Sequence, residues 1–179
     1  GFYAEKQDNM IESGHFTEPE LKIPVFSLYH DSRIPTKEMF DKIDILLVDI
    51  QDVGTRVYTF IYTISYCLEM AAKYHKKVLI LDRPNPVGGL QLEGNILSDD
   101  CRSFVGRFPI PMRHGLTVGE ISMLFNSEFN INSDLQVIPM LHWQRHMYFS
   151  DTGIPWIAPS PNLPSPRSCM VYPGQVIFE

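Results

Sequence analysis

The sequence lacks the signatures of the commonest α/β functions. Neither GxGxxG nor GxxxxGKS occurs around its 11 glycines, so the phosphate-binding loops of dinucleotide-binding and P-loop proteins are absent. GxSxG is absent too, which excludes the nucleophile elbow of the α/β-hydrolases. A nucleotide cofactor and a serine nucleophile of these types are therefore not expected.

Cysteine is scarce, with Cys67, Cys101 and Cys169 as the only three. Their spacing matches no zinc knuckle and no CxxC pair, and an odd number gives no complete disulfide framework. We expect small buried thiols rather than catalytic or metal-binding groups.

Long apolar runs and excess positive charge are also missing. No stretch approaches the length of a transmembrane helix, and no signal peptide is visible, although the chain starts at Gly1 rather than at a methionine. The formal net charge is −6 and the pI is about 5.5, which disfavours nucleic acid or an anionic membrane as the main partner. The 179 residues, 44% of them hydrophobic, are enough for one ordinary domain with a real core.

The apolar pattern predicts a parallel α/β sheet. Residues 43–50 form a near-continuous apolar run, which is typical of a strand buried on both faces. Residues 58–75 have helical spacing, and 78–82 form a second buried strand. This βαβ unit implies a right-handed crossover and parallel strands. Further expected elements are a loop at 1–22, a strand at 24–29, a helix at 37–40 capped by Thr36, a helix opened by the capping box of Thr117 and Glu120, and a strand at 135–139.

From Trp143 onward the pattern loosens into a proline- and aromatic-rich region. The predicted organisation is a partial doubly wound α/β domain over residues 1–142, followed by an irregular segment over 143–179. Trp156 and the prolines around 159–164 and 173 predict a stiff stretch that forms one wall of a sugar cleft or a rigid linker packed over the sheet.

Charged clusters follow two predicted strands. Asp49, Asp52 and Arg56 follow the first, and Asp82, Arg83 and Asn85 follow the second. Ligands bind beyond the carboxyl ends of parallel strands, so these residues predict a site at one sheet edge. An ion-paired loop cluster, with Asp82 bonded to Arg83 or Arg56, is an equally weighted alternative.

Three further places carry possible chemistry. Glu93 is flanked by aliphatic residues, and an acid in apolar surroundings can serve as a general acid, although an exposed glutamate on a hairpin is the more common situation. Arg113 and His114 precede the capped helix, where an anion such as a carboxylate would be stabilised; the alternative is that His114 only packs there. His142 and His146 could share a helix face, but no third ligand stands nearby, and a packing segment is favoured over a metal site.

Four strings, taken together and in order, resemble the NamZ-type exo-β-N-acetylmuramidase family of bacteria. They are DIQDVGTRVYT at 49–59, LDRPNPVGG at 81–89, RHGLTVGE at 113–120 and PSPNLP at 159–164. The resemblance implies a Rossmann-like catalytic domain, a smaller C-terminal subdomain that begins near 143, and a cleft between them. It also implies cleavage of terminal non-reducing β-linked N-acetylmuramic acid in muropeptides or disaccharides, without cofactor or metal, in an exported protein.

Two departures from the family pattern accompany the resemblance. Family members are about twice this length, so it implies that a first strand and helix precede this chain and that a subdomain follows it. The family also usually has Glu-His directly before the glycine that matches Gly1, and that Glu is a candidate catalytic acid.

The resemblance carries over a set of candidate site residues. Our expected catalytic or stabilising carboxylates are Glu93, Asp52 and Asp49. Arg56, Arg83 or Arg113 is expected to hold the lactyl carboxylate, and Asn85 and Asn162 the N-acetyl or hydroxyl groups, with Asp82 and His114 also in the substrate site. The alternatives are a non-catalytic sugar-acid binding module and an inactive fragment, because fold alone does not decide function.

Overall fold

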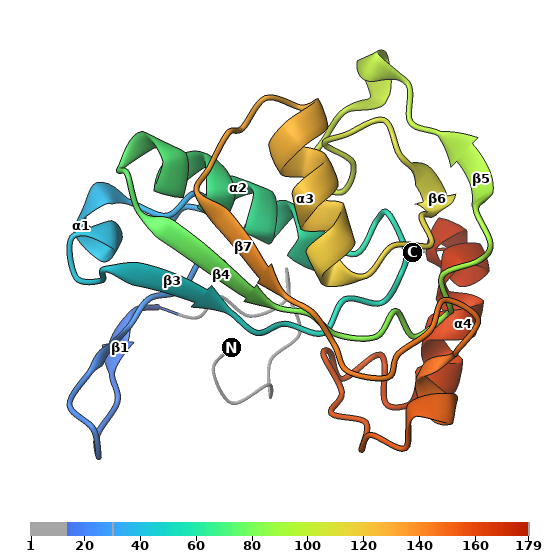
Figure 1. Cartoon of the computed structure of the whole chain (residues 1–179). Coiled ribbons are helices and arrows are strands. Elements are labelled where there is room, and N and C mark those ends of the chain that lie inside the picture. Colours follow the sequence, from blue (N-terminus) through green and yellow to red (C-terminus); the bar gives the residue numbers. More distant parts are fainter. Residues whose placement is uncertain (1–13, 30, 179) are drawn as a thin grey trace.

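The computed structural model describes residues 14–29 and 31–178. A three-stranded parallel sheet has the order β3-β4-β7 (Figure 1). Its strands are β3 (Ile45–Val48), β4 (Lys77–Leu81) and β7 (Leu135–Ile138). Leu46 is in register with Val78, and Val78 is in register with Leu135. The expected parallel α/β architecture is confirmed.

Two helices cover one face of this sheet, α2 (Phe60–Lys73) and α3 (Val118–Glu128) (Figure 1). The core between them and the sheet contains Ile64, Leu68 and Val118 from the helices, and Val48, Val78 and Ile80 from the strands. The α3 capping box is confirmed, because Thr117 and Glu120 bond to each other's backbone N–H groups. The expected βαβ unit, made of β3, α2 and β4, is also present. Both ends of α2 lie within two residues of the expected bounds.

The expectation that residues 43–50 form a strand buried on both faces is wrong. The strand is shorter, and Ile45 and Leu47 are 49% and 57% exposed on the face away from the helices, as is Ile138 at 40%. An apolar run shows that a strand can be buried on both faces. It does not show whether another element is present to cover the second face.

The remaining elements differ in part from expectation. Part of the expected loop 1–22 is a hairpin strand, and the expected strand 24–29 is only two residues long. The bounds are β1 (Phe16–Thr17), β2 (Pro24–Val25), α1 (Lys37–Phe40), β5 (Glu93–Ile96), β6 (Pro111–Arg113), and the 3₁₀ turns η1 (Asp99–Cys101), η2 (Phe149–Thr152) and η3 (Val176–Phe178). β1 pairs with β2, and β5 with β6, both antiparallel.

The proline-rich end of the chain was expected to be irregular, but it contains a helix. Helix α4 (Pro166–Gln175) begins with a proline, where the missing N–H is harmless, and it tolerates Pro173 in its last turn. Leu163 and Cys169 pack with Val53 and Val87. Residues 159–175 are therefore fastened directly onto the loops that follow β3 and β4.

Candidate active site

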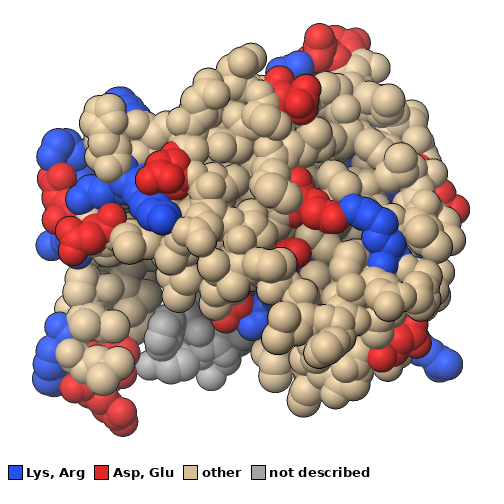
Figure 2. Space-filling view, viewed as in Figure 1, with Lys and Arg blue, Asp and Glu red and all other residues tan. Residues whose placement is uncertain are grey.

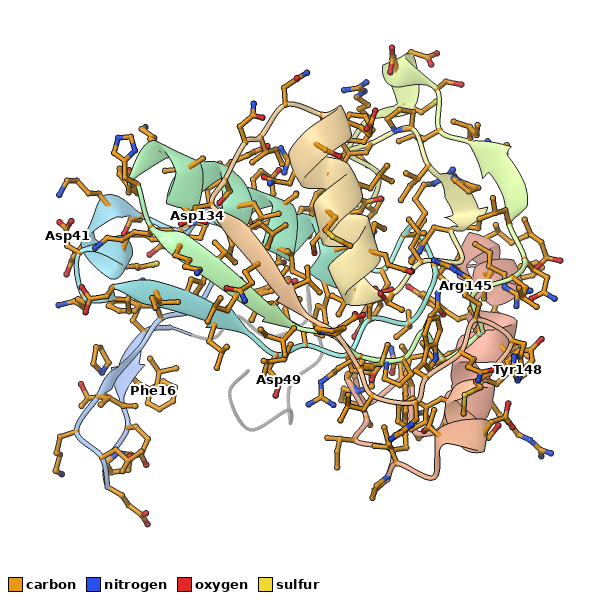
Figure 3. The ribbon with its side chains drawn as sticks, viewed as in Figure 1. Phe16, Asp41, Asp49, Asp134, Arg145 and Tyr148 are labelled. Atoms are coloured by element: carbon orange, nitrogen blue, oxygen red, sulfur yellow. The ribbon has the colours of Figure 1, made fainter. Side chains whose placement is uncertain are left out.

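Loops from three parts of the chain meet beyond the carboxyl ends of β3 and β4. Arg83 Nε donates to Asp49 Oδ1 at 2.5 Å, which joins the ends of the two strands. Gln51 Nε2 donates to the carbonyl of Pro84 at 3.0 Å, and Asn85 Nδ2 donates to the carbonyl of Leu116 at 2.9 Å. Three of the four signature strings thus lie against one another, and Figure 3 shows Asp49 just beyond the end of β3.

Asp82 holds the first turn of α3 onto the end of β4. Its carboxylate accepts hydrogen bonds from Thr117 Oγ1 at 2.9 Å, from the Gly119 N–H at 2.8 Å and from the Arg83 N–H at 3.0 Å. Burial raises the pKa of Asp82, against the opposing effect of these hydrogen bonds. The carboxylate is an anion at a helix N-terminus, and the anion belongs to the protein itself.

Asp52 and His114 form a pair that is almost fully buried. His114 Nε2 lies 3.3 Å from Asp52 Oδ2, and their side chains are 1% and 5% exposed. His114 Nδ1 accepts from the Leu116 N–H at 3.2 Å, so in the neutral ring the proton sits on Nε2, facing Asp52. Asp52 Oδ2 accepts from the Gly54 N–H at 2.8 Å, whereas Asp52 Oδ1 and His114 Nε2 have no hydrogen-bond partner among the described residues. Buried polar atoms without a hydrogen bond are rare in folded proteins, so this pair is a candidate part of a functional site.

The Arg56 side chain is buried and bonds backbone carbonyls, and it does not lie open at the surface. It is 5% exposed, and its Nη1 donates to the carbonyls of Asn95 at 2.7 Å and Ile110 at 2.8 Å. Its own carbonyl accepts from Tyr62 Oη. Burial leaves little of Arg56 open to a ligand in the described structure, and its expected contact with the lactyl carboxylate stays a prediction.

Glu93 does not sit in the apolar surroundings expected for a general acid. Its side chain is 62% exposed and accepts from Arg113 Nη1 at 2.6 Å. The flanking Leu92 and Ile96 are themselves 67% and 63% exposed, because the β5–β6 hairpin lies at the rim of the described structure. Arg113 is 14% exposed and also donates to Val87 O and Gln91 Oε1. Both terminal nitrogens are therefore used by the protein, whereas the buried Nε has no hydrogen-bond partner among the described residues.

The two candidate asparagines differ in exposure to solvent. Asn85 is 2% exposed; besides donating to Leu116 O, its Oδ1 accepts from the Val87 N–H at 3.0 Å. In the described structure Asn85 cross-links two loops, and its expected contact with the N-acetyl or hydroxyl groups stays a prediction. Asn162 is exposed and directly precedes the buried Leu163, so its side chain stays available to a ligand.

The histidine pair at 142 and 146 does not share a helix face. The segment is a loop, and His142 has a left-handed backbone with φ +63°. In the part of the chain that the structure describes, no three His, Cys, Asp or Glu residues gather as metal ligands would. Within the same residues, no helix has the length and apolarity needed to cross a membrane.

Arg145 is a contributor to the site that sequence reasoning missed. Its Nη1 donates to the carbonyls of Gly89 and Gly115, both at 3.2 Å, and its Nη2 pairs with Glu120. In the view of Figure 3, Arg145 lies over the upper part of α4 and below β6. It links the loop after β7 to the loop between β4 and β5, to the loop after β6 and to α3. No sequence signal marks it, because it belongs to none of the four signature strings.

Acidic and basic side chains lie in small mixed groups on the described part of the face in Figure 2, with broad uncharged areas between them. The ion pairs described above have the same mixed character.

A protein-family comparison matches residues 1–167 to the N-terminal part of the family described as exo-β-N-acetylmuramidase NamZ. The chain is 49% identical over 168 residues to the peptidoglycan β-N-acetylmuramidase NamZ of Bacillus subtilis (strain 168), covering 94% of this chain and 41% of the relative.

Two solved structures of DUF1343 family proteins from Bacteroides fragilis NCTC 9343 share the fold. The first has a TM-score of 0.87 at 43% identity and covers 90% of this chain and 43% of its own. The second has a TM-score of 0.77 at 37% identity, with coverages of 87% and 42%. The chain thus spans less than half the length of each relative. On the match over residues 1–167, the chain belongs to the exo-β-N-acetylmuramidase NamZ family and corresponds to its N-terminal part.

Proposed function

We propose that the full-length protein containing this chain is a glycoside hydrolase that releases terminal non-reducing β-linked N-acetylmuramic acid from peptidoglycan fragments. The observation that carries the proposal is the meeting of the signature loops at one sheet edge, where Arg83 joins Asp49 and His114 joins Asp52. Support also comes from the 49% identity to a relative named a peptidoglycan β-N-acetylmuramidase.

The proposal divides the three candidate carboxylates by accessibility. Asp49 and Glu93 are 45% and 62% exposed, so they can contact a sugar directly. Each is paired with an arginine and is suited to accept hydrogen bonds from hydroxyls or to stabilise positive charge at the anomeric carbon. Asp52 is buried, and its proposed role is to hold His114 and the loop 52–56 in place.

The proposal places the proton donor elsewhere in the full-length protein. An acid that protonates the leaving oxygen must be protonated before attack, and an ion-paired carboxylate is a poor choice. We also propose that residues 143–179 begin the C-terminal subdomain, which would supply the other wall of the cleft.

A digest of peptidoglycan fragments tests the proposal. Full-length protein incubated with the disaccharide of N-acetylmuramic acid β-linked to N-acetylglucosamine should release both monosaccharides, detected by mass spectrometry. An isomer with N-acetylglucosamine at the non-reducing end should stay intact. Cleavage of neither disaccharide by folded protein rules the glycosidase out.

A sugar-acid binding module is the second candidate, and the pairing of both exposed carboxylates with arginines favours it. The two functions separate on Asp49→Asn. In an enzyme, the fold-decrease in kcat should exceed the fold-increase in the Kd for substrate by about tenfold or more. The reason is that the charge of Asp49 acts mainly in the transition state. In a binder there is no turnover to lose.

A further inference from the structure

Three arginines of the site are candidates to hold a carboxylate, Arg56, Arg83 and Arg113, and they differ in burial and in which of their donors the protein uses. Arg56 is 5% exposed, with Nη1 shared between two backbone carbonyls. Arg113 is 14% exposed and bonds Glu93, Val87 and Gln91 through Nη1 and Nη2. Burial keeps Arg56 away from a ligand, although its Nε has no hydrogen-bond partner among the described residues. Arg113 would have to give up internal partners to offer both terminal nitrogens.

Arg83 has the opposite arrangement. Its side chain is 37% exposed and bonds Asp49 through Nε alone. Among the described residues, its Nη1 and Nη2 have no hydrogen-bond partner. These two nitrogens form the end of the planar guanidinium group, an edge whose spacing matches the two oxygens of a carboxylate.

The base of the Arg83 side chain is held firmly. Its backbone N–H donates to Asp82 Oδ1 at 3.0 Å, and Asp82 is itself fixed by Thr117 and Gly119. Pro84 follows and restricts the Arg83 backbone. Asp49 then fixes the direction of the side chain through Nε. An arginine fixed at both ends loses less entropy when it binds a ligand.

Charge also bears on what Arg83 binds. Asp49 is half-exposed, so water screens its charge, and it meets Nε rather than the open edge. A carboxylate arriving at Nη1 and Nη2 therefore uses a different edge of the guanidinium from the one that Asp49 occupies.

We propose that Arg83 is the specificity-determining residue that binds the carboxylate of the sugar acid, with Asp49 as the residue that orients it. The proposal rests on the function proposed above, since it assigns the carboxylate that distinguishes N-acetylmuramic acid from N-acetylglucosamine. It predicts that replacing this carboxylate with the neutral carboxamide of similar size removes the contribution of Arg83.

A binding cycle on the full-length protein tests the assignment. Calorimetry would compare N-acetylmuramic acid with its carboxamide in the wild type, Arg83→Ala, Arg83→Lys and Arg102→Ala. Arg102 is the matched control, because it forms an exposed ion pair with Asp99 that is not part of the site. The wild type and Arg102→Ala should bind the acid about 10-fold or more tightly than the carboxamide. Arg83→Ala should bind the two equally, and Arg83→Lys should fall between.

Each outcome has a defined meaning. Equal binding of acid and carboxamide by the wild type, or an undiminished preference in Arg83→Ala, overturns the assignment. Turnover measured on the same variants judges the proposed function separately. A preference that depends on Arg83, in a protein that cleaves nothing, supports the carboxylate site and rejects the glycosidase.

Discussion

At the scale of single residues, Gly119 shows why Asp82 can approach α3 so closely. A Cβ at this position would lie 2.6 Å from Val137 Cγ1 and 2.9 Å from the Asp82 carboxyl. We expect Gly119→Ala to lower the free energy of unfolding by about 1–3 kcal/mol, measured by urea denaturation. Gly174→Ala is the control, because a Cβ there meets nothing within 4 Å and helix propensity favours alanine. An equal loss in both variants would contradict this packing.

The raised pKa of Asp82 gives a pH prediction. Because burial raises its pKa in the folded state, the folded protein binds more protons than the unfolded chain between the unfolded value of about 3.9 and the raised value. The contribution of Asp82 to stability therefore falls as pH rises through this window. In denaturation series, the stability of the wild type relative to Asp82→Asn should decrease from pH 4 to pH 7. A constant or increasing difference would contradict the direction of the shift.

The thiols give a third prediction. Burial raises the pKa of Cys67 and of Cys169 to about 12, whereas Cys101 is exposed. Since the thiolate is the reactive form, a thiol reagent should modify Cys101 rapidly in the native protein at pH 8. Cys67 and Cys169 should react only after unfolding. Peptide mapping of the modified protein distinguishes the three, and early modification of Cys169 would contradict its burial.

At the scale of elements, side-chain capping of the first turn stabilises α3 more than it stabilises α1. Thr117 caps α3 through the Glu120 N–H and also donates to Asp82. Thr36 stands at the same position of α1 without a side-chain cap bond. We expect Thr117→Ala to cost about 1–2 kcal/mol and Thr36→Ala to cost about 0.5 kcal/mol or less, both measured by thermal or urea denaturation. Equal costs would mean that the cap does not fasten α3.

The sequence predicted these elements to different degrees, for physical reasons. The capping box of α3 is a local motif, so Thr117 and Glu120 were sufficient to find it. The exposure of Leu47 depends on what packs against the sheet from elsewhere, and a strand's own residues do not contain that information. Helix α4 was hidden by its prolines, although proline in a first turn favours a helix.

The site residues follow the same division. That Asp49 and Arg83 would lie together followed from parallel strands alone, because both come directly after a strand. The burial of Asn85 and Arg56 did not, since it depends on the contacts of Leu116 and Ile110, which come from distant parts of the chain. Arg145 carried no signal, because only the folded loops bring it to Gly89 and Glu120.

At the scale of the whole molecule, the buried Asp52–His114 pair couples the loop after β3 to the loop after β6. A double-mutant cycle of Asp52→Asn and His114→Gln on unfolding free energy should give a coupling of about 1 kcal/mol or more. Additive losses would show that the two residues act independently. A substantial coupling would mean that the loop after β3 and the loop after β6 contribute to stability as one unit.

The central claim is that this edge of the sheet belongs to an enzyme specific for a β-linked sugar acid. The most direct measurement follows release of a chromogenic leaving group by the full-length protein from β-linked N-acetylmuramic acid, with the N-acetylglucosamine analogue beside it. The two sugars differ only in the lactyl ether. We predict release from the muramic acid compound alone. Release from both equally would contradict the carboxylate specificity, and release from neither by folded protein would contradict the enzyme.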